Sequence, residues 1–410
     1  MSAGAQRIME RLAALALVTD EPGQITRTYG SPALRRANDL VAGWMREAGL
    51  AVSEDAIGNL LGRYEGAQLG AKAFLLGSHL DTVRNAGAFD GPLGVILALE
   101  CVAKLSEKNS RLPFALEVIG FCDEEGVRFQ TTYLGSRALA GTLTEADLQR
   151  VDENGVTLAQ AMRNFGGQPE NLPLAKCPPS RLLGYAEVHI EQGPVLEQKQ
   201  HAVGVVTAIA GQSRLKARFT GQAGHAGTTP MNLRRDALCA AAEFISAVET
   251  HASSIAGLVA TVGLIQVAPG ASNVIPGEAR LTLDVRHEND AARLEAVQNL
   301  QGTAEDIGRL RGVFVTWETV METASVPCDL ELTGLLRRAA TGHQHEVTEL
   351  PSGAGHDAAV MGKITPATML FVQCHGGLSH HRDESARVED VAVAFDVMND
   401  FLQLLAERHA

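Results

Sequence analysis

Leu75-Leu-Gly-Ser-His-Leu-Asp-Thr-Val-Arg-Asn-Ala-Gly-Ala-Phe-Asp-Gly-Pro-Leu-Gly94 is the stretch around which the rest of the chain is organised. The apolar residues 73–76 indicate a buried strand, and polar side chains follow it at once. His79 and Asp81 are two residues apart, so in an extended chain their side chains point to the same side. Asp90 lies in a glycine-rich loop just before a helical pattern. Open α/β sheets present ligands in this way at the carboxyl ends of their strands, so this stretch is a candidate metal site.

The composition narrows the classes of protein to consider. The chain has 410 residues, which is too many for one small core and typical of two domains. Its formal net charge is −13 and it has no run of Lys or Arg, so we expect no nucleic-acid partner. No signal-peptide pattern and no apolar run of membrane-spanning length occur, so we expect no membrane partner. The 6 Cys include no CxxC pair, which is typical of reduced thiols in a cytoplasmic protein.

The pattern of apolar segments predicts the fold class. Apolar runs at 114–121 and 183–190 end in acidic or polar residues, as the first one does, and helical patterns lie between the runs. This alternation predicts an α/β fold, a mostly parallel sheet with helices on both faces. Further along, apolar and polar residues alternate with period two, as in antiparallel strands with one solvated face. We therefore predict a discontinuous catalytic domain, residues 1–210 and 324–410, interrupted by an inserted α+β domain at residues 211–323.

Side chains that bind metals follow the apolar runs in four places along the chain. They are His79, Asp81, Asp90, Asp123, Glu124, Glu125, His189, Glu191, His356, Asp357, His375, His380, His381 and Asp383. Imidazole and carboxylate together suit zinc, manganese, cobalt or nickel. Two neighbouring ions need a bridging carboxylate, for which Asp90 is well placed, and such a pair of ions supplies a nucleophile at neutral pH. One such segment alone fits an ordinary loop, but four of them favour a metal site.

The adjacent acids Glu124 and Glu125 are expected to have two different roles. Side chains of neighbouring residues diverge where they leave a strand. One carboxylate can therefore bind a metal ion while the other faces the reacting water as a general base.

Five motifs together resemble a known family. They are Ser78-His-Leu-Asp-Thr82, Asp123-Glu-Glu-Gly126, Glu187-Val-His-Ile-Glu-Gln-Gly193, Gly224-His-Ala-Gly-Thr-Thr-Pro230 and Leu378-Ser-His380. In this order they are similar to the hydantoinase/carbamoylase-type amidases: allantoate amidohydrolases, N-carbamoyl-L-amino acid hydrolases and β-ureidopropionases. That family belongs to the wider group of dinuclear metallopeptidases that includes aminoacylase. The resemblance covers nearly the whole chain.

The resemblance implies two divalent metal ions per subunit, zinc in the first place, with manganese, cobalt or nickel as alternatives. The implied ligands are His79, Asp90, Glu125, His189 and His380, with Asp90 as the bridge. Glu124 is implied as the general base, and Asp81 as the carboxylate that orients His79. The family order favours His380 over the adjacent His381. His356 either contacts the substrate or holds its own loop.

The resemblance also assigns substrate-binding residues, several of them in the inserted domain. An Arg beside an Asn suits capture of a carboxylate, and the family pattern gives this task to Asn273 and Arg286. Gln192 and His225 are assigned to the carbamoyl end of the substrate. His225 would come from the partner subunit of a homodimer formed through the inserted domain. Gln212 remains an open candidate for a substrate contact.

The implied reaction is hydrolysis of the ureido C–N bond of a small carboxylate-bearing molecule, either an N-carbamoyl-L-amino acid or allantoate. Ammonia and carbon dioxide would be released. Three alternatives are an aminoacylase or dipeptidase-type metallopeptidase, a binding protein that has lost its metals, and a scaffold that uses only the dimerisation domain. His189 and the Glu191-Gln-Gly193 continuation favour the ureido branch. The complete ligand set beside Glu124 argues against the two non-enzymatic alternatives.

Overall fold

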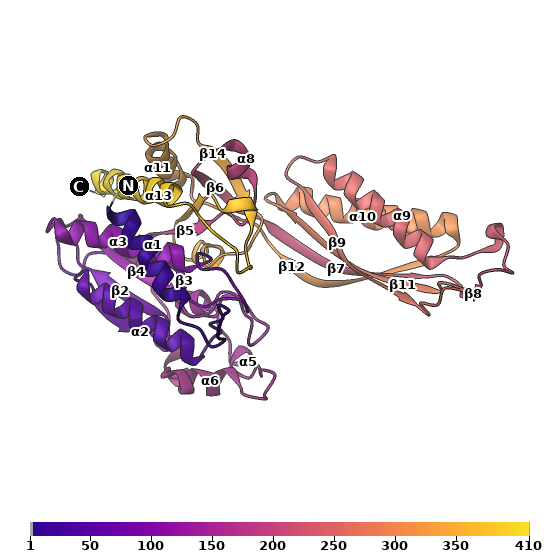
Figure 1. The fold of residues 1–410 in the computed structure, drawn as a ribbon, viewed down its shortest axis with the longest axis horizontal. Coiled ribbons are helices and arrows are strands. Elements are labelled where there is room, and N and C mark those ends of the chain that lie inside the picture. Colours follow the sequence, from indigo (N-terminus) through magenta and orange to yellow (C-terminus); the bar gives the residue numbers. More distant parts are fainter. Residues whose placement is uncertain (1–2, 410) are drawn as a thin grey trace. The chain divides into compact units, whose positions relative to one another are not determined.

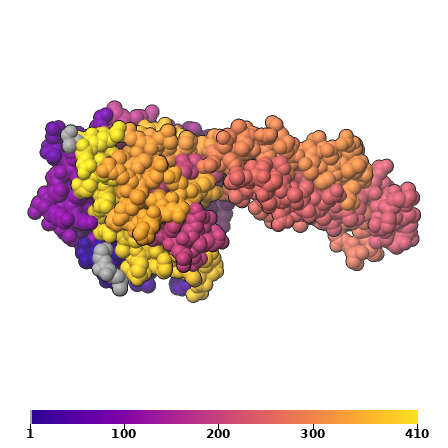
Figure 2. All heavy atoms as spheres, turned by 90° about the horizontal axis from the view of Figure 1, so that it is seen from above, coloured from indigo at the N-terminus to yellow at the C-terminus, as the bar shows by residue number. Residues whose placement is uncertain are grey.

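The computed structural model describes residues 3–409, and these divide into two compact units. One unit combines the chain up to Thr207 with the chain from Cys328 onward, and the other is Ala208–Pro327. In the first unit the C-terminal residues, yellow in Figure 2, lie against residues from the N-terminal part, indigo and purple. The rings of Phe74 and Phe401 are an example, with centroids 5.7 Å apart.

The first unit is built on a nine-stranded sheet whose central strands are parallel. Its main path is β1-β2-β4-β3-β5-β15-β6-β13, and β14 pairs with β6. Figure 1 shows this sheet with several of its strands labelled. The pairs β4–β3, β3–β5 and β5–β15 are parallel, and the pairs on either side are antiparallel. The strands are β1 (Ala51–Glu54), β2 (Leu60–Tyr64), β3 (Ala73–His79), β4 (Ala115–Phe121), β5 (Leu182–Ile190), β6 (Val203–Ile209), β13 (Val326–Pro327), β14 (Thr348–Ser352) and β15 (Ala367–Val372). The last two residues of β6 and the paired strand β13 are the first and last residues of the second unit.

Helices flank this sheet, and every residue of β3 and of β15 is buried, so both faces of its centre are covered. The predicted fold class, α/β with a mostly parallel central sheet, is confirmed. The longer helices are α1 (Ala3–Ala16), α2 (Pro32–Glu47), α3 (Pro92–Glu107), α11 (Leu330–Thr341) and α13 (Val388–His409). The shorter ones are α4 (Leu134–Ala140), α5 (Glu145–Leu148), α6 (Leu158–Phe165), α7 (Leu172–Ala175), α8 (Val195–Lys199) and α12 (Ala358–Met361). None of the helices within residues 3–409 has the length and apolar character to cross a membrane.

Two glycines allow α3 to pack closely enough to position the candidate site. Gly91 precedes α3 with φ 82°, and a Cβ there would lie 2.4 Å from the ring of His79. Gly94 lies in the first turn of α3, and a Cβ there would lie 2.2 Å from the carbonyl oxygen of Val188 on β5. The start of α3 therefore touches the ends of both β3 and β5 because neither glycine has a side chain.

The second unit is a four-stranded antiparallel sheet in the order β12-β7-β11-β9, with two helices on one face (Figure 1). Residues of β7 alternate between buried and exposed, because the helices cover only one side of the sheet. Phe219 and Phe244 join the sheet to the helices in a core that belongs to this unit. The elements are β7 (Gly211–Thr220), β8 (Gly224–His225), α9 (Ala237–Ser253), β9 (Val259–Ala268), β10 (Val274–Ile275), β11 (Glu278–His287), α10 (Asp290–Arg311) and β12 (Phe314–Thr323).

Replacing Gly94 by Ala should destabilise the first unit, because the new Cβ would collide with the carbonyl of Val188. Removing this collision requires a shift of α3 or β5. We expect the shift to lower the free energy of unfolding by about 1–3 kcal/mol. Gly43 in α2 is a matched control, since a Cβ there meets no neighbouring atom within 4 Å. Gly43→Ala should stabilise the helix by up to about 1 kcal/mol. Urea unfolding curves measure both changes, and equal values for the two variants would contradict this account.

Candidate metal centre

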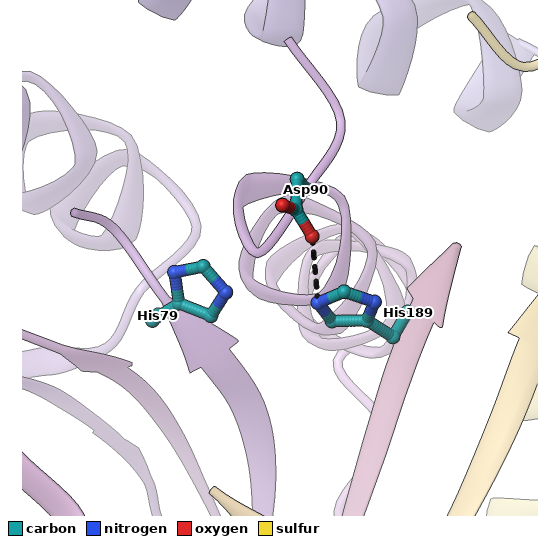
Figure 3. Close-up of side chains that lie close together, drawn as sticks. All are labelled: His79, Asp90 and His189. Atoms are coloured by element: carbon teal, nitrogen blue, oxygen red, sulfur yellow. Dashed lines mark ion pairs between the residues drawn. The ribbon is translucent and has the colours of Figure 1, made fainter. Parts of the chain in front are cut away.

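The first group of candidate ligands lies where two neighbouring parallel strands end. His79 is the last residue of β3, His189 lies near the end of β5, and Asp90 comes from the loop before α3 (Figure 3). The imidazole ring centroids are 5.8 Å apart, and Nε2 of His189 is 3.2 Å from Oδ1 of Asp90. One ligand atom from each residue lies within 4.8 Å of the other two. All three side chains are buried, so they form a compact donor set for one cation.

The second group shares Asp90 with the first. Nε2 of His380 is 3.1 Å from Oδ2 of Asp90 and 3.6 Å from Oε1 of Glu125. Ligand atoms of these three residues also lie within 4.8 Å of one another. The two oxygens of Asp90 thus face different histidines, as a carboxylate that bridges two ions must. The structure brings together all five residues that the sequence motifs put forward as ligands.

The protonation of the two buried histidines suits metal binding. Nδ1 of His79 lies 3.0 Å from the carbonyl oxygen of Asp81, and Nδ1 of His189 lies 2.9 Å from the carbonyl oxygen of Ile190. A carbonyl oxygen only accepts hydrogen bonds, so each Nδ1 carries a proton and Nε2 is the ring atom left to bind a metal ion. The donor set therefore fits divalent ions that prefer imidazole and carboxylate.

Asp81 connects His79 to the two glutamates that follow β4. Its carboxylate lies 3.4 Å from Nδ1 of His79. The same carboxylate accepts hydrogen bonds from the backbone N–H groups of Glu124 (2.9 Å) and Glu125 (3.2 Å). One buried side chain therefore fixes the orientation of a candidate ligand and of both candidate acids.

The site concentrates buried negative charge. Burial raises the pKa of Glu124 well above its ordinary value, the nearby His79 opposes this, and the neighbouring Glu125 adds to it. Burial likewise raises the pKa of Glu125 to about 7. A bound cation would offset the effect of burial and favour the ionised form of both acids.

Gln192 lies beside the shared carboxylate. Its backbone has the unusual φ of 58°, and its Nε2 donates to Oδ1 of Asp90 (3.0 Å) and to Oγ of Ser379 (3.1 Å). Its Oε1 is buried and has no hydrogen-bond partner among residues 3–409. That oxygen is an acceptor that a ligand N–H group can satisfy. The preceding residue, Glu191, instead accepts the N–H groups at the start of α8.

His356 lies behind His189 and not at an open surface. It is 1% exposed, its ring meets that of His189 edge-on at 4.5 Å, and its Nε2 is 2.8 Å from Oγ of Ser352. Burial lowers the pKa of His356 well below its ordinary value, so the ring is neutral. Glu187, which also lies near these rings, is held by the hydroxyl of Ser78 and the N–H of Ala358. These contacts favour the interpretation that His356 holds its loop.

In the second unit, His225 and Asn273 lie side by side. His225 in β8 pairs with Val274 in β10, and the carbonyl of Asn273 accepts the N–H of Ala226 (2.9 Å). His225 lies on β8, which Figure 1 shows beyond the end of β7.

Gln212 and Arg286 lie at the other end of the same strands. They are opposite each other in the pairing of β7 with β11. Arg286 forms a two-point ion pair with Asp284, and Gln212 and Arg214 donate to the same carboxylate. Thr220 lies eight positions along β7 from Gln212, which is ~26 Å at roughly 3.3 Å per residue. Within one chain the predicted substrate-binding residues of this unit therefore form two distant sets.

Two residues at the site were missed by the sequence analysis. Glu384 is 5% exposed, and its carboxylate accepts the backbone N–H groups of Phe89 and Asp90. Tyr133 has a left-handed backbone (φ 64°), its N–H donates to the carbonyl of Glu124, and burial raises its pKa well above the ordinary value. A single Glu in a polar loop and a single Tyr before a helix give no signal in the sequence.

Comparison with known proteins identifies the family. The family described as Peptidase family M20/M25/M40 matches residues 75–404. The chain belongs to this family. It is 42% identical over 403 residues to the N-carbamoyl-L-amino acid amidohydrolase of Geobacillus stearothermophilus, a match that covers 98% of each chain. It is also 42% identical over 425 residues to a probable allantoate deiminase of Oryza sativa subsp. japonica, covering 96% of this chain and 87% of that one.

A solved structure gives the same result. The hydantoinase/carbamoylase family amidase of Burkholderia multivorans superposes with a TM-score of 0.92 at 33% identity, and the match covers 97% of each chain. The resemblance that the five sequence motifs indicated is thus confirmed.

The adjacent histidines His380 and His381 provide a matched test of the second donor group. His380→Ala removes the imidazole that faces Asp90 and Glu125, so we expect metal to be held at least about 10-fold more weakly at this group. His381→Ala should keep the metal content of the wild type. Metal per protein chain after dialysis against metal-free buffer, measured by atomic absorption, distinguishes the two. Equal metal content in both variants would remove His380 from the ligand set.

Proposed function

We propose that this chain is a metal-dependent amidohydrolase that cleaves the ureido C–N bond of a small carboxylate-bearing molecule and releases ammonia and carbon dioxide. The observation that carries the proposal is the pair of donor groups that share Asp90 beside the buried Glu124. Relatives that match nearly the whole chain are named N-carbamoyl-L-amino acid amidohydrolase and probable allantoate deiminase. We therefore propose an N-carbamoyl-L-amino acid or allantoate as the substrate.

The proposed cofactors are two divalent ions, with zinc in the first place and manganese, cobalt or nickel as alternatives. His79, Asp90 and His189 would hold one ion, and Asp90, Glu125 and His380 would hold the other. When bound, such ions polarise a carbonyl oxygen and lower the pKa of water.

Glu124 is the proposed general base. It would take a proton from the attacking water and pass this proton to the leaving nitrogen, after which the carbamate product decays to carbon dioxide and ammonia. Burial, which favours the protonated carboxyl, supports this shuttle, and Asp81 holds the backbone of Glu124 in place. His225 would donate to the oxygen that becomes negatively charged in the tetrahedral intermediate.

Gln192 is the proposed contact for the ureido group, because its unpartnered Oε1 can accept a hydrogen bond from a ureido N–H. Asn273 and Arg286 are the proposed contacts for the substrate carboxylate. The ion pair with Asp284 would hold the Arg286 guanidinium in a fixed orientation, and Gln212 would support this orientation through the same carboxylate.

A homodimer formed through the second unit is part of the proposal. The strand β9 at one edge of its sheet is ten residues long and has no charged residue, whereas β12 at the other edge carries Glu318 and Glu322. Val259 and Leu264 on β9 are exposed. An uncharged, unprotected edge strand is suited to pairing with a second copy of the chain.

We also propose a cytoplasmic location. All 6 Cys are free thiols, and four of them are buried. The absence of disulfides from the described residues supports a reducing compartment.

A panel of substrates tests the reaction. The metal-loaded protein should release ammonia from allantoate or from N-carbamoyl-L-amino acids, with 3-ureidopropionate, N-acetyl-amino acids and a dipeptide as comparisons, and with zinc, manganese, cobalt and nickel tested in turn. Glu124→Gln should keep its metal but lose roughly 10²-fold or more in rate, because the proton acceptor is gone. Hydrolysis of N-acetyl-amino acids or the dipeptide with none of the ureido compounds would contradict the proposal. A near-normal rate for Glu124→Gln would assign the base to another group.

Exchange of subunits tests the role of His225 across the dimer. Homodimers of His225→Ala and of Glu124→Gln should both be inactive. If His225 serves the partner's site, a mixed dimer has one site with both lesions and one intact site, so activity should return to about one working site per mixed dimer. Asn273→Ala should complement Glu124→Gln in the same way, because Asn273 lies beside His225. Proven exchange between differently tagged chains without recovery would mean that His225 acts in its own subunit or has no role.

A further inference from the structure

Glu384 connects two segments that are far apart in the sequence and that both carry candidate ligands. Its Oε1 accepts the N–H groups of Phe89 (2.9 Å) and Asp90 (3.0 Å). Its Oε2 lies 3.3 Å from the hydroxyl of Ser379, the residue before His380. One carboxylate therefore holds the backbone of Asp90 and the start of the segment that presents His380.

The approach of this side chain depends on a glycine in the opposite loop. A Cβ on Gly87 would lie 2.3 Å from the carboxyl carbon of Glu384. Any side chain at position 87 would displace Glu384 from the two N–H groups. The position of Glu384 thus requires a glycine at position 87, although the two residues are 297 positions apart in the chain.

The hydrogen bonds continue from Glu384 to the shared carboxylate itself. The hydroxyl of Ser379 is also within 3.4 Å of Oδ2 of Asp90, and it accepts a hydrogen bond from Nε2 of Gln192 (3.1 Å). None of these contacts involves His79 or His189. The network therefore supports the second donor group, Asp90, Glu125 and His380, more directly than the first.

We propose that Glu384 is a positioning residue for the second donor group. By fixing the peptide before Asp90 and the hydroxyl of Ser379, it holds Oδ2 of Asp90 at the right place relative to His380. Loss of Glu384 would weaken the binding of the ion at the second donor group more than that of the ion at the first, because the first group shares only Asp90 with this network. The inference rests on the two-ion site of the proposed function, so it is tested by metal binding and not by turnover.

The test is titration of metal-free protein with zinc, in competition with a chromophoric chelator. The wild type should show two binding steps. In Glu384→Ala we expect one step weakened by about 10–100-fold, as is usual for the loss of a partner outside the ligand set, and the other weakened clearly less. Gly87→Ala should weaken the same binding step, because the new methyl group in the loop before Asp90 displaces Glu384 without removing it.

Two further variants separate positioning from general destabilisation. Glu384→Gln should restore both steps to within a few-fold of the wild type, because its amide oxygen can accept both N–H groups and its NH₂ can donate to Ser379. Glu191 is a matched control, since it is also buried and also accepts two backbone N–H groups, those of Val195 and Leu196. Glu191→Ala should leave both steps unchanged.

The outcomes distinguish this inference from the proposed function. Two wild-type-like steps in Glu384→Ala or in Gly87→Ala overturn the positioning role and leave the two-ion site intact. Equal weakening of both steps in either variant, or failure of Glu384→Gln to restore binding, also overturns it. A wild-type protein that takes up only one ion overturns the two-ion site and this inference together.

Discussion

The buried charge of Asp90 is the constraint on which the rest of the first unit depends. Burial by itself would raise the pKa of Asp90, but the imidazoles of His380, His189 and His79 hold this pKa below its ordinary value. A buried carboxylate without such partners would be strongly unfavourable. Its partners come from β3, β5 and the loop after β15, so the order of strands in the sheet is also what keeps this charge stable.

Space around Asp90 is as important as charge. Gly87, Gly91 and Gly94 each lie where a Cβ would collide with a neighbour, namely Glu384, the ring of His79 and the carbonyl of Val188. The loop and helix that follow β3 can therefore approach the strand ends only because these positions have no side chain. The sequence contains 41 Gly, and nothing local distinguishes these three from those in ordinary turns. Their role becomes visible only when the opposing segments are in place.

Residues whose role shows in the neighbouring sequence could be predicted, and residues whose role depends on distant segments could not. His79 was predictable because it follows an apolar run closely, and Asp90 because it lies in the glycine-rich loop before the next helical pattern; both are local properties of the chain. The grouping of all five candidate ligands followed from motifs in a known order. Glu384 escaped prediction because its partners lie nearly 300 residues earlier in the chain. The inserted unit was expected at 211–323 and spans Ala208–Pro327, since the alternating pattern begins only after the chain has left the central sheet.

The rigid strands of the second unit constrain how a substrate can be held. A hinge at the two connections would move this unit as a body. Such a motion would leave unchanged the distance between Arg286 at one end of the sheet and the pair His225 and Asn273 at the other. The register of β7 with β11 fixes that distance through continuous backbone pairing. A small substrate that contacts both sets, as proposed, must therefore receive them from two different chains. Asn273 would then reach the same active site as His225 of its own chain, and Arg286 would reach the other one. The two groups proposed for one carboxylate would therefore come from different subunits.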